Sequence, residues 1–136
     1  MLLFAVDCRP AMLAGGKDSP ALEAFQAILA IYKSKAVANM NDRVGVVLFG
    51  TAVANNASGF DSIHVLLDLD EPSVESVKTL SRIVSGLLIS FISSWLTGSC
   101  IGDIDIAEEY GSTDAPFPLA NVLWICSGLL VDGCVT

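Results

Sequence analysis

Basic side chains are scarce in this sequence. Only seven of its 136 residues are Lys or Arg, against 15 Asp and Glu, so the formal net charge is −8. Binding to nucleic acid needs clustered cations that neutralise phosphates. The basic residues are instead scattered along the chain, which argues against a nucleic-acid surface: Arg9, Lys17, Lys33, Lys35, Arg43, Lys78 and Arg82.

Metal-binding patterns of Cys and His are also missing. The four cysteines include no Cys-x-x-Cys pair, and the only histidine, His64, belongs to another element. A zinc site is therefore not expected. We interpret the thiols as reduced and buried, as is usual inside cells, and His64 as an outward-pointing residue that is solvated or locally bonded rather than catalytic. The cysteines are Cys8, Cys100, Cys126 and Cys134.

The amino terminus has no basic region, because residues 1–6 are apolar and Asp7 follows at once. This makes a poor secretory signal and a good first strand. The uncharged run 83–102 is long enough for a membrane span, but it contains several Ser and Gly and lacks basic flanks beyond Arg82. We therefore expect a cytosolic or nuclear chain without a membrane segment, in which this run extends a helix packed on a sheet.

Apolar residues are abundant. Hydrophobic residues make up 53% of the chain and charged residues 16%, as is typical of a globular domain. The most informative stretch is 43–51, Arg-Val-Gly-Val-Val-Leu-Phe-Gly-Thr. Its unbroken apolar run from Val46 to Phe49, closed by Gly50, predicts a strand that is buried on both faces.

The residues before this strand predict a βαβ unit. Residues 2–6 form an apolar run that predicts a strand ending at Asp7. Ser19 and Pro20 are typical of a helix start, and the helix is expected to end near Asn39. A helix between two strands predicts parallel pairing with a right-handed connection. The expected apolar stripe of the helix is Leu22, Phe25, Leu29 and Tyr32.

The remaining chain predicts one strand and two helices. Residues 63–69 alternate in polarity, which favours a half-exposed strand at the sheet edge, antiparallel to the buried strand. Helices are expected from Pro72 and from Pro118, with an acidic, solvated loop at 103–109 between them. The resulting order βαββαα is an α/β fold, a partial doubly wound sheet of an incomplete domain. The expected apolar stripes are Val74, Val77, Leu80 and Val84 for the first helix, and Leu119, Val122, Leu123, Cys126, Leu129 and Leu130 for the second.

Four stretches, 2–12, 42–51, 60–72 and 119–132, resemble in order the amino-terminal α/β domain of the Ku heterodimer. The last two resemble its smaller, seventy-kilodalton subunit more than its larger one. The resemblance implies a von Willebrand factor A-like fold and identifies residues 1–136 as a truncated fragment, the amino-terminal half of that domain. Residues 82–112 do not share it, and we interpret them as an atypical apolar insert, with a retained intron as a hypothesis.

The resemblance also implies a function. Ku acts in the nucleus in DNA double-strand break repair by non-homologous end joining and in telomere maintenance. The implied partners are the larger Ku subunit, end-joining and telomere proteins, and double-stranded DNA ends, which the full-length protein and not this fragment would hold. The family carries an ATP-dependent DNA helicase designation. We find no catalytic motif in this chain, and the lysine that the family's lyase activity uses is missing.

A stand-alone von Willebrand factor A-like protein-interaction domain is the alternative. Metal-binding members of that class need Asp-x-Ser-x-Ser after the first strand, so that a carboxylate and two hydroxyls hold a cation. This chain has Asp7, but Arg9 and Ala11 stand in the hydroxyl positions. The site is thus degenerate, and no metal is expected.

A nucleotide-binding enzyme would need a glycine-rich phosphate loop after the first strand. The segment Gly15-Gly16-Lys17-Asp18 has neither the GxGxxG nor the GxxxxGK[ST] spacing. It predicts a plain loop, and no cofactor is expected.

Overall fold

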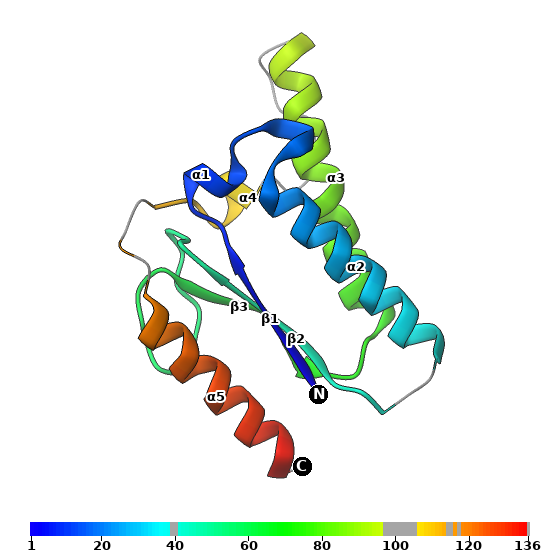
Figure 1. Ribbon diagram of the computed structural model, residues 1–136, viewed down its shortest axis with the longest axis vertical. Coiled ribbons are helices and arrows are strands. Elements are labelled where there is room, and N and C mark those ends of the chain that lie inside the picture. The colour runs from blue at the N-terminus through cyan, green and yellow to red at the C-terminus, as the bar shows by residue number, and fades with distance from the viewer. Residues whose placement is uncertain (39–40, 97–105, 114–115, 117, 136) are drawn as a thin grey trace.

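The computed structural model describes residues 1–38, 41–96, 106–113, 116 and 118–135 (Figure 1). Three strands form one sheet in the order β1 (Leu2–Asp7), β2 (Val44–Phe49) and β3 (Ile63–Asp70). β1 and β2 pair in parallel, whereas β3 runs antiparallel to β2. The α/β class, the βαβ unit and the antiparallel edge strand are confirmed.

The central strand β2 is buried along its whole length. Side chains alternate between the two faces of a strand, so Val46 and Leu48 enter one hydrophobic cluster and Val47 and Phe49 another. Both faces of β2 therefore need cover, as its unbroken apolar run predicts.

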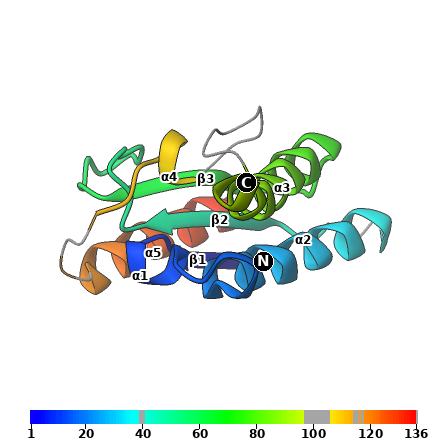
Figure 2. The ribbon, with the colours of Figure 1, turned by 90° about the horizontal axis from the view of Figure 1, so that it is seen from above.

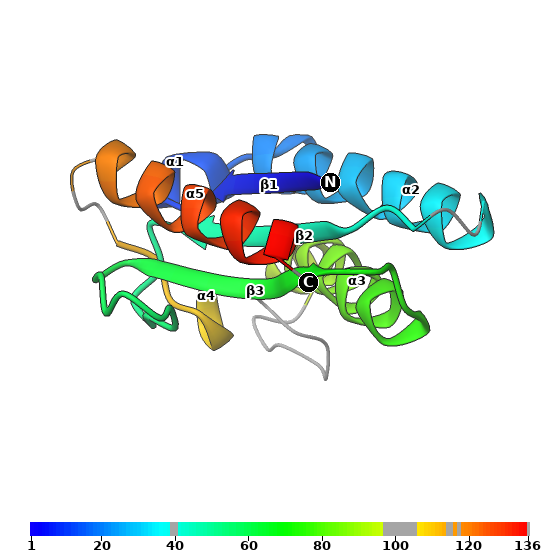
Figure 3. The same cartoon turned by 90° about the horizontal axis from the view of Figure 1, so that it is seen from below.

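Helices provide that cover on both faces of the sheet (Figures 1 and 3). α2 (Pro20–Ala38) and α3 (Val74–Leu96) pack on the face of Val46 and Leu48. α5 (Leu119–Val135) packs on the face of Val47 and Phe49. No helix in the described part of the chain combines the length and apolarity needed to span a membrane.

The predicted start of α2 is confirmed. Pro20 is its first residue, and the backbone N–H of Leu22 donates a hydrogen bond of 3.2 Å to Oγ of Ser19. The hydroxyl of Tyr32 donates a bond of 2.8 Å to the carbonyl of Val44, which ties the helix to the central strand. All four residues of the predicted stripe are buried: Leu22, Phe25, Leu29 and Tyr32.

The apolar faces of the other two long helices were predicted only in part. In α3, Leu80 and Ile83 are fully buried, but Val74 lies in the first turn and is exposed. In α5, Val122 is buried as predicted, together with Ile125 from outside the predicted set. Three members of that set are wrong, because α5 is turned so that they face outward: Leu119, Leu123 and Leu130.

Three short helical segments were not predicted. α1 (Pro10–Leu13) follows β1, and the 3₁₀ helix η1 (Gly16–Asp18) replaces the plain loop expected there. α4 (Ile106–Glu109) replaces part of the expected solvated loop, and Ile106 is fully buried. The other positions of that loop, 103–105, lie outside the described residues. Figures 1 and 2 show α1 and α4 at the same end of the sheet.

Candidate functional site

The carboxyl ends of β1 and β2 lie side by side because the two strands are parallel, and ligands of open α/β sheets bind at such an edge. β1 ends at Asp7 and β2 at Phe49, which pair in register. The segment Ile106–Thr113 crosses this edge. It is held there by backbone bonds of 2.9 Å from Val53 to Tyr110 and from Thr113 to Gly50.

The guanidinium group of Arg9 binds the carboxylate of Asp7. Nε of Arg9 lies 3.0 Å from both Oδ1 and Oδ2 of Asp7, and Nη2 lies 2.6 Å from Oδ2. The backbone N–H of Arg9 donates a further bond of 3.0 Å to Oδ1. Two side chains that the sequence places two residues apart thus form a closed, forked ion pair.

The ion pair controls the charge of Asp7. Partial burial acts to raise the pKa of Asp7, but hydrogen bonds and the positive charge of Arg9 outweigh it and hold the pKa below its usual value. Asp7 is therefore ionised at neutral pH, with its negative charge already balanced inside the protein.

The arrangement does not fit a divalent cation. Both oxygens of Asp7 already accept bonds from Arg9. Ala11 lies in α1 and has no oxygen in its side chain. Among the described residues, no group of three or more His, Cys, Asp or Glu side chains could hold a metal ion. That the site is degenerate remains a prediction, which binding measurements must test.

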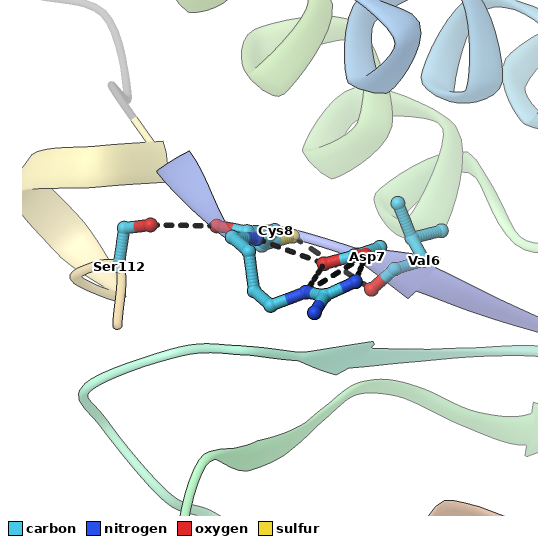
Figure 4. Close-up of polar contacts among 5 residues, drawn as sticks. Val6, Asp7, Cys8 and Ser112 are labelled. Carbon is cyan, nitrogen blue, oxygen red and sulfur yellow. Dashed lines mark hydrogen bonds and ion pairs between the residues drawn. The ribbon is translucent and has the colours of Figure 1, made fainter. Parts of the chain in front are cut away.

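Cys8 lies between Asp7 and Arg9 in the sequence and is fully buried. Burial, assisted by the negative charge of Asp7, raises the pKa of its thiol to about 12. The hydroxyl of Ser112 donates a bond of 2.8 Å to the Cys8 carbonyl, as Figure 4 shows. The Cys8 thiol is thus neutral and unreactive where it sits, beneath the segment that crosses the edge.

Gly50 lets the two strand ends approach each other. Its φ of 77° lies in the left-handed region, and a Cβ there would be 2.5 Å from Cγ of Arg9. Only glycine tolerates both demands without strain. Glycine at position 50 therefore leaves room for the side chain of Arg9, which neutralises Asp7.

His64 does not match its predicted place. Instead of pointing into solvent, its ring packs edge-on against Tyr110 with the ring centroids 4.7 Å apart. Its Nδ1 is buried without a hydrogen-bond partner in the described part of the chain. The contact was missed because Tyr110 follows a stretch with no clear periodicity. An isolated aromatic residue among acidic neighbours was the only signal.

The Gly15-Gly16-Lys17-Asp18 segment forms no phosphate loop. The backbone N–H of Asp18 bonds to the carbonyl of Gly15 at 3.2 Å, and Ser19 bonds to Gly16 at 3.1 Å. These bonds close η1 and lead directly into α2. The amide groups of Asp18 and Ser19 are therefore used within the turn.

The whole sequence, residues 1–136, matches the profile of the Ku70/Ku80 N-terminal alpha/beta domain. The chain belongs to this Ku family. Its α/β sheet is accordingly a Ku amino-terminal domain fold, and the resemblance of the four quoted stretches is confirmed.

Curated relatives carry Ku-type names. The chain is 28% identical over 127 residues to "ATP-dependent DNA helicase 2 subunit 1" of Rhipicephalus appendiculatus, which covers 93% of the chain and 18% of that protein. It is 33% identical over 95 residues to "ATP-dependent DNA helicase II subunit 1" of Phaeosphaeria nodorum, covering 61% and 15%. It is 31% identical over 67 residues to "X-ray repair cross-complementing protein 5" of Dictyostelium discoideum, covering 47% and 8%. The chain thus spans less than a fifth of the length of these relatives.

Proposed function

We propose that this chain is the amino-terminal half of the α/β domain of a Ku-type subunit, the smaller one, which acts in the nucleus in double-strand break repair by non-homologous end joining and in telomere maintenance. The observation that carries the proposal is the match of all 136 residues to the Ku amino-terminal domain. The stretches 60–72 and 119–132, which resemble the smaller subunit more than the larger one, favour the smaller subunit.

The proposed task of this part of the subunit is protein contact rather than DNA contact. The net charge is −8, and several basic side chains form ion pairs with carboxylates within the described residues. These pairs are Arg9–Asp7, Lys35–Asp42 and Lys78–Glu75. Cations neutralised in this way contribute little to a phosphate-binding groove. The proposed partners are the larger Ku subunit and end-joining or telomere proteins, without a membrane.

Co-purification with the larger Ku subunit of the same organism tests this proposal. The tagged 136-residue chain and an untagged larger subunit would be co-expressed and purified through the tag. We expect the larger subunit to elute with the chain and not with an unrelated tagged α/β domain of similar size and charge. Elution of equal amounts with both would contradict the proposed pairing.

DNA-end binding by the chain alone is a separate prediction. We expect a short blunt duplex to bind no better than the non-specific range of about 10⁻⁴ to 10⁻⁶ M at physiological salt. A gel-shift titration measures it, with the complete subunit paired with its larger partner as the positive control. Nanomolar retardation by the 136-residue chain would contradict the charge argument and the placing of end binding elsewhere in the protein.

A stand-alone von Willebrand factor A-like interaction domain with a degenerate metal site is the second candidate. The forked pair between Arg9 and Asp7 favours this candidate. Because Arg9 neutralises Asp7, the carboxyl edge of the sheet needs no metal cation to balance that charge. The two candidates differ in their partners. A domain that works alone would retain its binding proteins in cells that lack the larger Ku subunit, whereas a Ku-type fragment would lose them.

We also propose that 82–112 is an atypical insert within the Ku-type domain that originates from a retained intron. Residues at both ends of the stretch are in the core, including Ile83, Leu87 and Ile106. An insert would therefore have become part of the packed fold. Sequencing the transcript tests the idea: a spliced message that codes through this region without the stretch supports it, and one that retains the stretch contradicts it.

A further inference from the structure

The segment Ile106–Thr113, which we name the strap, closes the carboxyl edge of the sheet. Two backbone bonds and the Ser112 hydroxyl fix it to the strand ends. Its apolar anchors are Ile106 and Tyr110, both buried in the cluster under α2 and α3. Gly111, with φ of 66°, crosses so close to Ala52 that a side chain would collide there. The strap thus fits tightly at a few points.

His64 is a titratable group in contact with the strap. It lies on β3 opposite Leu48 of β2, and the ring of Tyr110 packs edge-on against it at 4.7 Å. Its Nδ1 is fully buried and has no hydrogen-bond partner among the residues that the structure describes. A neutral imidazole can leave this nitrogen as an unpaired acceptor at modest cost, but a protonated one must bury an N–H donor and a positive charge there.

The charged groups around His64 do not remove that cost. Burial lowers the pKa of His64, and the carboxylate of Glu109 on the strap acts only partly against it. From α3, Arg82 contributes a positive charge near Tyr110. From the adjoining loop, Asn55 bonds through its backbone to Ile63 and Val65 on either side of His64 and carries no charge. The closed strap therefore favours neutral His64.

We propose that the strap is a pH-sensitive latch, closed over the sheet edge while His64 is neutral and released when His64 takes up a proton. Because the pKa of His64 in the folded chain lies below its ordinary value, acid destabilises the closed strap. The strap is fully stabilised above the ordinary His value of about 6.5 and loses stability as the pH falls below it, because the open state takes up the proton more readily.

Release of the strap uncovers the edge that it crosses. The Cys8 carbonyl loses the hydroxyl of Ser112, and Gly50 loses its bond from Thr113. The strand ends would then present backbone groups and the buried thiol of Cys8 to solvent. The latch would thus control access to the same edge where open α/β sheets bind ligands.

Hydrogen exchange measured by mass spectrometry tests the latch in the 136-residue chain. Exchange of peptides covering 106–113, corrected for intrinsic rates, should be several-fold faster at pH 5.5 than at pH 7.5. Peptides from β2 should not change, because the latch does not open the sheet. The matched variant His64→Phe keeps an aromatic ring against Tyr110 but cannot titrate, so its strap should exchange at the same corrected rate at both pH values. Equal pH responses of the two proteins would overturn the proposal.

The variant Glu109→Gln provides a second, independent readout. Glu109 is exposed, and its amide counterpart keeps the size of the side chain but removes the charge that favours protonated His64. Without this carboxylate, a protonated His64 costs more free energy in the closed state. The acid-induced opening should therefore be larger than in the unmodified chain. A smaller or unchanged response would show that the charge on His64 does not drive the opening.

Discussion

At the scale of single residues, the carboxyl edge depends on the side chain two positions after Asp7. The sequence alone indicated that Arg9 replaces a hydroxyl ligand, and the structure adds where the guanidinium goes. It forks onto both carboxylate oxygens of Asp7, which is only 13% exposed. A cation would have to displace a charged group that is already bonded in place, in addition to lacking the oxygens that calcium normally has.

We therefore expect no tight binding of magnesium or calcium at Asp7. Isothermal titration calorimetry of the chain should show no micromolar affinity for either ion. The matched variant Arg9→Ser with Ala11→Ser restores the Asp-x-Ser-x-Ser pattern and removes the competing charge, so binding of magnesium should appear there. Micromolar affinity in the unmodified chain that disappears in Asp7→Ala would prove this prediction wrong.

Gly50 and Gly59 offer a matched pair for the packing of the same edge. Both have positive φ, 77° and 66°, but a Cβ at Gly50 would meet Arg9, whereas nothing lies within 4 Å of one at Gly59. Gly59→Ala should cost about 1 kcal/mol of unfolding free energy from backbone strain alone. Gly50→Ala should cost about 3 kcal/mol, because overpacking is added to the strain. Urea unfolding at low protein concentration measures both, and equal losses would contradict the role given to the Arg9 contact.

At the scale of elements, the sequence predicted best where one physical signal dominated. The unbroken apolar run of β2 requires burial on both faces, and the Ser19-Pro20 pair satisfies the start of α2 with a local hydrogen bond. Both predictions depend on short-range chemistry. Both were correct because no tertiary contact opposes the local preference.

Prediction failed where the outcome depends on a distant partner. α5 is apolar almost all round, so its sequence does not specify which side meets the sheet, and the side with Ile125 was missed. His64 was expected to point outward because no residue near it in the sequence indicates the contact with Tyr110, which comes from another part of the chain. The strap was missed for the same reason. The candidate site was thus predicted at Asp7, Arg9 and Ala11, and its cover was not.

The start of α2 gives a test at this scale. Ser19→Ala removes the oxygen that accepts from the N–H of Leu22, and this N–H is buried, so we expect a loss of about 1 kcal/mol in unfolding free energy. Ser127→Ala is the control, because Ser127 is exposed within α5 and bonds to the carbonyl of Trp124 in its own helix. It should cost nothing measurable. A comparable loss in both variants would show that the Ser19 bond is not what fixes the helix start.

At the scale of the whole molecule, the two layers of helices are not equivalent. α2 and α3 bury their stripes against the sheet and each other, whereas α5 buries Val122 and Ile125 and leaves a second apolar face outside. β1 forms one edge of the sheet, although its apolar residues are typical of a strand with neighbours on both sides. An exposed apolar helix face beside an unpaired strand edge favours association between chains. The outward apolar residues of α5 are Leu119, Leu123, Trp124, Leu130 and Val131.

We therefore expect the 136-residue chain by itself to self-associate and to be marginally stable. Light scattering during size-exclusion chromatography should show species larger than a monomer, and Trp124→Glu, at a side chain that is 67% exposed in the middle of the apolar face, should reduce them. Val37→Glu is the matched control, because Val37 is 86% exposed but stands apart at the end of α2. The same substitution should change association there very little, since a single exposed apolar residue makes no patch. A soluble monomer with a sharp, reversible melting transition, or an equal effect of the two variants, would show that the outer face of α5 does not govern how the chain behaves in solution.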